Sequence, residues 1–110
     1  MKKTWLITGC SSGLGRSLAK ETLKQGYNVV VTARNTDTIQ EIVDQYPQSA
    51  LGIALDVTNQ ESIRNAVKQA IDYFGSIDIL VNNAGYGYRS AIEEGTRQDI
   101  SKLFETNVWG

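Results

Sequence analysis

Residues 7–15, which read ITGCSSGLG, constrain the fold of this chain more than any other stretch. A short apolar, β-branched run leads into them at residues 4–8, and a helical pattern begins at Leu14. Glycines between a strand and a helix permit a tight turn, let the backbone approach a phosphate and allow the helix to pack closely. The N–H groups at the start of that helix would then bind the anion. The stretch therefore predicts a phosphate-binding turn, with a purely structural turn as the alternative.

The same stretch also resembles the lipidation signal of a bacterial lipoprotein, because Lys2, Lys3 and a short apolar run precede Ile-Thr-Gly-Cys. Only residues 4–9 lie between Lys3 and Cys10, however, whereas a signal sequence has about 7–15 apolar residues there. No apolar run approaches the roughly 20 residues that cross a bilayer. The single cysteine excludes an internal disulfide framework. We therefore expect a cytoplasmic protein with no membrane partner.

Strand and helix patterns alternate along the chain. Strands are expected at residues 4–8, 27–33, 50–55 and 77–81. Helices are expected at residues 14–26, at 36–46, after Thr58 or Asn59 as far as Gly75, and at 98–109. The apolar stripe of the first helix comprises Leu14, Leu18, Ala19, Thr22 and Leu23. This alternation predicts an α/β fold, a doubly wound parallel sheet of about four strands in three layers, within a single domain over residues 1–110.

Composition narrows the kinds of partner. Eleven basic and twelve acidic side chains give a net charge of −1, so bulk electrostatics favour neither nucleic acid nor an anionic membrane. The sequence contains no histidine, which excludes histidine general bases and zinc sites, and we expect no metal centre. An anion site in this chain therefore has to come from local geometry such as the glycine turn.

Four motifs together resemble the short-chain dehydrogenase/reductase family of NAD(P)-dependent oxidoreductases. They are TGCSSGLG from Thr8, LDV at residues 55–57, NNAG at residues 82–85, and Asn107 within TNVWG. The first has the TGxxxGxG form of that family, and the four occur in family order across the chain. The resemblance implies a Rossmann-type fold, an NAD(P)-binding domain, and hydride transfer between nicotinamide and an alcohol or carbonyl substrate.

The resemblance also implies roles for individual residues. Asp56 would accept a hydrogen bond from the adenine amine, with the Val57 backbone beside it; the alternative for this carboxylate is a cap at Thr58. Asn82 and Asn83 would brace the sheet near the ribose, while Ala84 and Gly85 leave room for the cofactor. The cofactor contacts expected in the glycine turn are Thr8, Gly9, Ser11, Ser12, Gly13, Leu14 and Gly15.

Charge at the end of the second strand predicts which cofactor is preferred. A strand that selects NAD usually ends in an acidic residue, which bonds the ribose 2′-OH and would repel the 2′-phosphate of NADP. Here the strand ends with uncharged Ala33, and the guanidinium of Arg34 can bind a phosphate bidentately. We therefore expect NADP(H). NAD(H) remains the alternative, because Asp37 follows three residues later and Arg34 could instead be a solvated loop cation.

The catalytic residues implied by the resemblance are mostly missing. Family members use a tyrosine, a lysine four residues later and a serine, but none of the five tyrosines here has lysine at that spacing. Only Asn107 of the catalytic tetrad is present, where it would position a water for the proton relay. Its alternative is a polar residue on the buried stripe of a helix.

We therefore expect a fragment, an incomplete Rossmann fold that stops within the helix ending at Gly110 and lacks its catalytic half. Two other functions stay open: a non-catalytic NAD(P)-binding module, or a piece that acts only by association through residues 100–108. Without its natural neighbour, the strand at residues 77–81 would leave an exposed apolar sheet edge, so we expect a homo-oligomer.

Overall fold

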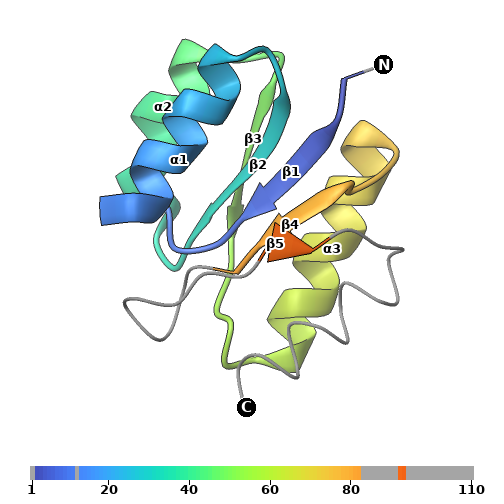
Figure 1. Cartoon of the computed structure of the whole chain (residues 1–110). Helices are drawn as coiled ribbons and strands as arrows, with labels where there is room; N and C mark the ends of the chain where they lie inside the picture. The colour runs from blue at the N-terminus through green and yellow to red at the C-terminus, as the bar shows by residue number, and fades with distance from the viewer. Residues whose placement is uncertain (1, 12, 83–91, 94–110) are drawn as a thin grey trace.

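A sheet of five strands organises the structure, a computed structural model that describes residues 2–11, 13–82 and 92–93 (Figure 1). Four strands run parallel, and a short fifth strand lies antiparallel beside the fourth. Their order across the sheet is β3-β2-β1-β4-β5. The chain therefore adds β2 and β3 on one side of β1 and then β4 on its other side. The strands are β1 (Thr4–Ile7), β2 (Asn28–Ala33), β3 (Ala50–Ala54), β4 (Ile79–Val81) and β5 (Ile92–Glu93). The predicted doubly wound parallel arrangement is therefore confirmed.

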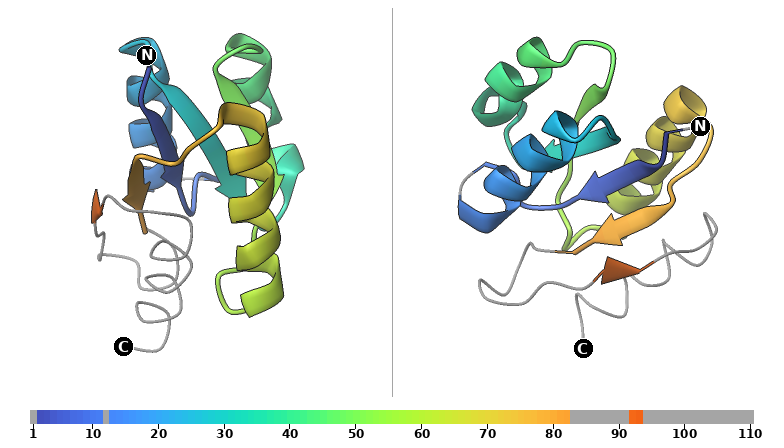
Figure 2. Two further views of the ribbon diagram at one scale, coloured as in Figure 1. Left: turned by 90° about the vertical axis from the view of Figure 1, so that its right-hand side faces the viewer. Right: turned by 45° about the horizontal axis from the view of Figure 1, so that its top comes forward.

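Helices cover both faces of the sheet and make three layers (Figure 2). α1 (Gly13–Lys24) and α2 (Gln40–Gln45) pack on one face, together with the 3₁₀ turn η1 (Thr36–Ile39), and α3 (Gln60–Phe74) packs on the other. Alternate residues of β2 enter the two cores, because Val29 and Val31 lie on the α1 side and Val30 on the α3 side. This double burial explains why the strand reads as a continuous apolar run. Within the described part of the chain, no helix is both long and apolar enough to span a membrane.

The helix predicted at residues 36–46 is divided into η1 and α2. The Asn35 side chain accepts a hydrogen bond from the Asp37 N–H at 3.0 Å, and the Thr38 hydroxyl donates to the Asn35 carbonyl at 2.7 Å. Such local side-chain bonds compete with regular α-helical pairing and favour the tighter 3₁₀ turn. The predicted helix is present, but its first turn is 3₁₀ and its α-helical part ends at Gln45.

The structure corrects the prediction of an open sheet edge at β4. β5 pairs with this strand through Leu80 opposite Glu93 and Val81 opposite Ile92. Backbone groups that an open edge would offer to another chain are therefore paired within this one. The expectation of an exposed edge was wrong at these two positions. The helix expected at residues 98–109 lies outside the described residues.

Two residues fix the ends of α3. The Asn59 side chain accepts a hydrogen bond from the Ser62 N–H at 3.1 Å, which makes Asn59, rather than Thr58, the N-cap. At the other end, Gly75 adopts a left-handed conformation with φ of 91° and donates its N–H to the Ile71 carbonyl at 2.7 Å. Both ends are therefore where the sequence predicted them.

Replacing the N-cap should destabilise the chain measurably. We expect Asn59→Ala to lower the free energy of unfolding by about 1 kcal/mol, because the Ser62 N–H loses its acceptor. Asn59→Asp keeps a side-chain acceptor, so its free energy of unfolding should remain close to that of the parent protein. Urea unfolding followed by circular dichroism measures both. Asn65→Ala, an exposed position inside the same helix, is the matched control. An unchanged midpoint for Asn59→Ala would contradict the cap.

Cys10 lies in the turn after β1 and is completely buried. Its thiol donates a weak hydrogen bond to the Ile7 carbonyl at 3.2 Å, and its backbone N–H donates to the Thr32 carbonyl at 2.9 Å. Burial raises the pKa of this thiol to about 12, even though the hydrogen bond with the Thr32 backbone and the charge of Arg16 act in the opposite direction. The sulfur is therefore a packing group and not a nucleophile.

Because Cys10 is the sole cysteine in the chain, its labelling should report on unfolding. At about pH 8, we expect a disulfide-exchange reagent to modify the folded protein about 100-fold or more slowly than the urea-unfolded protein, since the raised pKa removes the thiolate and burial blocks access. Absorbance of the released thiol follows both rates. Equal rates in the folded and unfolded protein would contradict the buried position.

Candidate functional site

The carboxyl ends of the parallel strands meet at one edge of the sheet, and the strand order reverses between β1 and β4 (Figure 1). The residues that follow these strand ends are distant in sequence but adjacent in the sheet, and they are Thr8, Arg34, Asp56 and Asn82. In open α/β sheets, such a switch point is where ligands bind. Thr8, Asp56 and Asn82, which come from three of the four motifs, therefore lie at the same edge of the sheet.

The glycine turn connects β1 to α1. Gly9 and Gly13 have φ values of 67° and 63°, a left-handed conformation that residues with side chains rarely adopt. A Cβ atom built on Gly13 would meet no described atom within 4 Å, so the left-handed conformation, and not a neighbouring group, is what favours glycine. The first turn of α1 contains no acidic residue. An anion can therefore approach the helix N-terminus without repulsion from that turn.

The remaining residues of the turn divide between the core and the surface. Gly15 is buried, whereas Ser11 is exposed. The prediction that Leu14 belongs to the buried stripe of α1 is wrong, because this side chain is 62% exposed. It lies in the first turn of the helix, beyond the end of β1, and the stripe is buried only further along, at Ala19, Thr22 and Leu23. Ser12 lies outside the described residues.

Hydrogen bonds join the glycine turn to both strands beside β1. On one side, the Thr8 backbone N–H donates to the Val81 carbonyl at 3.0 Å and its hydroxyl donates to Asn82 Oδ1 at 3.3 Å. On the other side, the Cys10 N–H donates to the Thr32 carbonyl at 2.9 Å, and the Thr32 hydroxyl donates to the Ile7 carbonyl at the end of β1 at 2.8 Å. All three polar side chains, Thr8, Thr32 and Asn82, are buried. Thr32 was not predicted, because a threonine within a β-branched run gives no signal beyond strand propensity.

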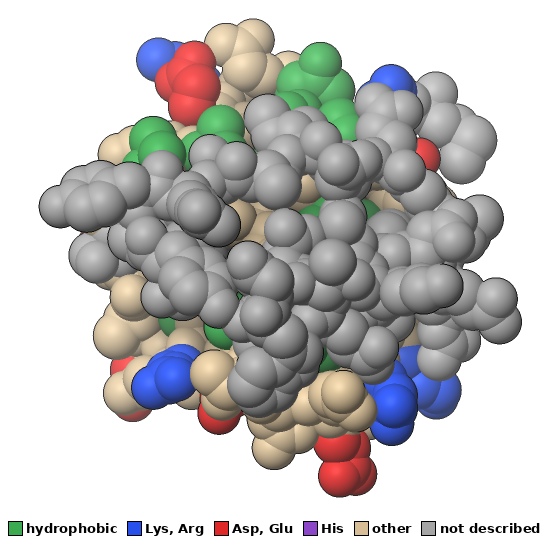
Figure 3. All heavy atoms as spheres, turned by 60° about the horizontal axis from the view of Figure 1, so that its bottom comes forward, with side chains coloured by type: hydrophobic (Ala, Val, Ile, Leu, Met, Phe, Trp, Pro, Cys, Tyr) green, Lys and Arg blue, Asp and Glu red, His purple; other side chains and the backbone are tan. Residues whose placement is uncertain are grey.

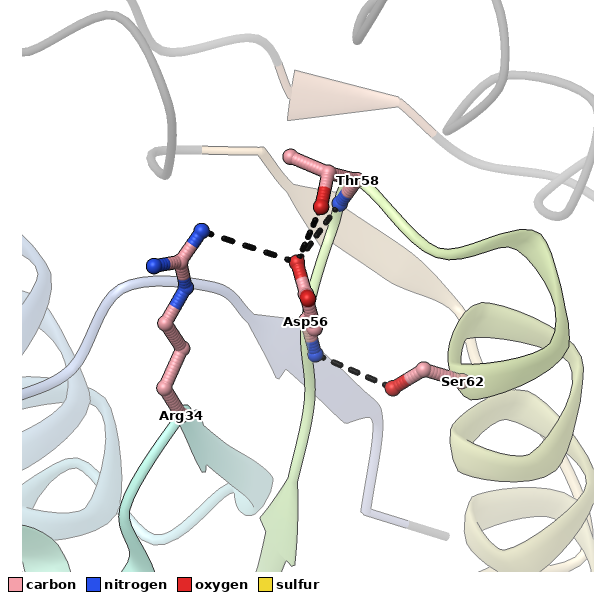
Figure 4. A network of polar contacts seen from close by, with 4 residues as sticks. All are labelled: Arg34, Asp56, Thr58 and Ser62. Carbon is pink, nitrogen blue, oxygen red and sulfur yellow. Dashed lines mark hydrogen bonds and ion pairs between the residues drawn. The ribbon is translucent and has the colours of Figure 1, made fainter.

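The Asp56 carboxylate is held in place by Thr58 (Figure 4). Its Oδ1 accepts the Thr58 N–H at 2.9 Å and the Thr58 hydroxyl at 2.6 Å, while the Asp56 N–H donates to Ser62 Oγ at 3.0 Å. The bonds from the Thr58 side chain and backbone, followed by the charge of Arg34, lower the pKa of Asp56 against the effect of burial. The carboxylate is therefore ionised at neutral pH. The alternative prediction that it binds Thr58 is correct, although α3 begins at Gln60.

Arg34 follows β2 and reaches toward the same carboxylate oxygen. Its Nη2 lies 3.6 Å from Asp56 Oδ1, and the Arg34 side chain is 75% exposed. Ala33, immediately before it, is buried in the sheet. The guanidinium thus stands at the adenosine end of the predicted site with most of its surface in solvent. Asp37, the residue that kept NAD(H) open, is exposed in η1.

Sequence reasoning did not single out Arg16, which joins two parts of the site. This side chain leaves the first turn of α1, donates from Nη1 to the Thr38 carbonyl at 3.0 Å and forms an ion pair with Glu41. It therefore fixes the segment after β2 against the helix that begins at the glycine turn. The partners are 22 residues apart for the hydrogen bond, so no local spacing rule could have revealed the contact.

The arrangement fits a dinucleotide in three respects: an open left-handed turn at a helix N-terminus, an exposed guanidinium and a fixed carboxylate. Figure 3 shows basic and acidic side chains of the described residues interspersed around the rim of this face. Val57 is buried beside Asp56. The predicted residues Asn83, Ala84, Gly85 and Asn107 lie outside the described residues. Among the described residues, no three His, Cys, Asp or Glu side chains gather in a way that could hold a metal ion.

Comparison with known proteins gives concordant results. The family model described as short chain dehydrogenase matches residues 3–110. The protein named oxidoreductase calM from Penicillium decumbens is 41% identical over 111 residues, which cover 97% of this chain and 36% of that protein. A crystal structure of a short-chain dehydrogenase from Streptomyces avermitilis matches with a TM-score of 0.73 and 43% identity, over 76% of this chain and 31% of that one.

A second solved structure resembles the chain in the same way. It is the 3-ketoacyl-(acyl-carrier-protein) reductase from Brucella melitensis complexed with NADH, with a TM-score of 0.67 and 35% identity over 71% of this chain and 32% of that one. The chain spans between 36% and 47% of the length of the curated relatives considered. The match over nearly the whole sequence, the parallel sheet and the glycine turn agree, and the chain belongs to the short-chain dehydrogenase family.

Proposed function

We propose that this chain forms the NADP(H)-binding part of an oxidoreductase that transfers a hydride between nicotinamide and a small alcohol or carbonyl substrate. The observation that carries the proposal is the open glycine turn at the start of α1, with the exposed Arg34 guanidinium at the end of the neighbouring strand. When bound, the cofactor would supply or accept the hydride. The chain's own residues would bind and orient it.

The pyrophosphate would lie against the glycine turn. Backbone N–H groups of the turn and of the first turn of α1 would donate to its oxygens, because these groups have no partner within the helix. The left-handed Gly9 and Gly13 give the chain the path that such an approach requires. Residues proposed to contact the cofactor here are Thr8, Gly9, Ser11, Ser12, Gly13, Leu14 and Gly15.

The adenosine half would lie between the ends of β2 and β3. Asp56 Oδ1 is occupied by Thr58, which leaves Oδ2 as the oxygen for the adenine amine, beside the Val57 backbone. Arg34 would bind the 2′-phosphate, and the preceding uncharged Ala33 would not repel it. We therefore favour NADP(H) over NAD(H). We propose Asn83, Ala84 and Gly85 as further cofactor contacts.

Catalysis would need groups that this sequence does not contain. Asn107 is the proposed catalytic residue present, whereas no tyrosine in the 110 residues has a lysine four positions later. We therefore expect this single domain, residues 1–110, to bind cofactor without turning over substrate alone. We also propose a cytoplasmic homo-oligomer. We propose no nucleic-acid or membrane partner, which the net charge of −1 supports.

Selectivity for the phosphate should depend on Arg34. We expect calorimetric titration to show tighter binding of NADPH than of NADH, and Arg34→Ala to weaken NADPH binding by about tenfold or more while NADH binding changes by less than about threefold. Lys24→Ala removes a cation from the opposite end of α1 and serves as the control. An equal loss of affinity for NADPH and NADH in Arg34→Ala would contradict a role of Arg34 in phosphate recognition.

The glycine turn can be tested separately from the phosphate. Gly13→Ala should weaken the binding of both nucleotides by about tenfold. The substitution strains a left-handed position and places a methyl group in the open space before the helix. Gly26→Ala is a matched control, since Gly26 has φ of 96° with equally open surroundings but lies at the other end of α1. Similar losses of nucleotide binding in the two variants would point to general destabilisation, which thermal unfolding of each would reveal.

A further inference from the structure

Arg34 and Asp56 are brought together by the register of the sheet and not by flexible loops. β2 and β3 pair from Val29 opposite Ala50 to Ala33 opposite Ala54, and the Leu55 N–H extends this pairing by donating to the Ala33 carbonyl at 2.9 Å. The two charged residues follow directly after this last bond. The register therefore places the two side chains within reach of each other, and Arg34 Nη2 lies 3.6 Å from Asp56 Oδ1.

The two partners differ in how firmly they are held (Figure 4). Asp56 is fixed on three sides, since its Oδ1 accepts two hydrogen bonds from Thr58 and its N–H donates to Ser62 Oγ. Among the described residues, Asp56 is the one side chain to which the Arg34 guanidinium is joined, and Arg34 is 75% exposed. Asp56 is thus a stationary negative charge, while Arg34 is the partner that can turn away.

We propose that Asp56 limits the preference for NADPH by competing with the 2′-phosphate for Arg34. This inference rests on the proposed function and adds a specificity-determining role for Asp56 beyond the adenine contact. A 2′-phosphate would have to draw the guanidinium from a carboxylate of the same sign as itself. NADH carries no such phosphate and binds without that exchange. Removing the charge of Asp56 therefore releases Arg34 for the phosphate and enlarges the difference in affinity between NADPH and NADH.

The opposite effect, in which Asp56 positions Arg34 for the phosphate, is disfavoured by the geometry. The 3.6 Å separation is longer than a hydrogen bond, and both side chains are substantially exposed. Exposed pairs of this kind restrain a long side chain only weakly. The competing negative charge acts at the same place and stays ionised at neutral pH. Competition should therefore outweigh positioning.

The test is a double-mutant cycle read as dissociation constants of NADPH and NADH, without any turnover. In Asp56→Asn, we expect the preference for NADPH over NADH to rise by about threefold to tenfold at low salt. An altered adenine contact cancels in this ratio, because both nucleotides carry the same adenine. In the Arg34→Ala background, Asp56→Asn should change the ratio of the two dissociation constants by less than half as much. The guanidinium for which the carboxylate and the 2′-phosphate compete is then absent.

Two further variants keep the result interpretable. Asp56→Glu retains the charge and should keep the ratio close to that of the parent. Asp72→Asn is the matched control, because Asp72 also lies 3.6 Å from a cationic partner, Lys68, but at the far end of α3. Circular dichroism and thermal unfolding of each variant verify the fold.

The outcomes separate the inference from the function on which it rests. If the parent chain binds neither nucleotide, the proposed function fails and the inference fails with it. If the parent binds both and Asp56→Asn leaves the ratio within twofold or lowers it, the inference alone is overturned. An equal rise in the presence and absence of Arg34 also overturns it, because the carboxylate would then act on the phosphate directly.

Discussion

The placement of β1 between β2 and β4 is the constraint on which the site depends. β1 pairs along its whole length with β2 and from Trp5 onward with β4, and side chains of the two helix layers cover both of its faces. Because β1 has a paired strand on each edge and a helix layer on each face, the position of its carboxyl end is fixed. The turn that follows it begins there. Thr8 bonds to the end of β4, and the Cys10 N–H bonds to the Thr32 carbonyl of β2. The left-handed glycines then direct the chain into α1.

Charge in the site is local rather than global. The chain is nearly neutral, with eleven basic and twelve acidic side chains. In the proposed function, recognition of the cofactor's phosphates would therefore depend on oriented backbone N–H groups and on individual guanidinium groups. Arg16 and Arg34 differ in this respect, since the first is bound to the Thr38 carbonyl and Glu41 and organises protein, whereas the second is mostly in solvent. Arg34 therefore presents much more of its side chain to a ligand than Arg16 does.

The sequence predicted those parts of the fold whose signals are local. The glycine turn, the continuous apolar run of β2, and the Asn59 and Gly75 caps each carry their signal within a few residues, and the structure confirms them. Contacts between distant segments were less accessible. The Arg16 contact with η1 and the pairing of β5 with β4 depend on how elements approach one another in space. Leu14 failed for a related reason, because helical periodicity cannot tell where the sheet beneath the helix ends.

The same central strand has a consequence for the order of events during synthesis. Thr8 bonds to Asn82, which lies 74 residues later, and to the backbone of Val81. A nascent chain can form β1, α1 and β2 early, but one side of the glycine turn has no partner until β4 has left the ribosome. Closing so long a loop is slow compared with forming a helix. The turn should therefore be among the last of the described features to become ordered.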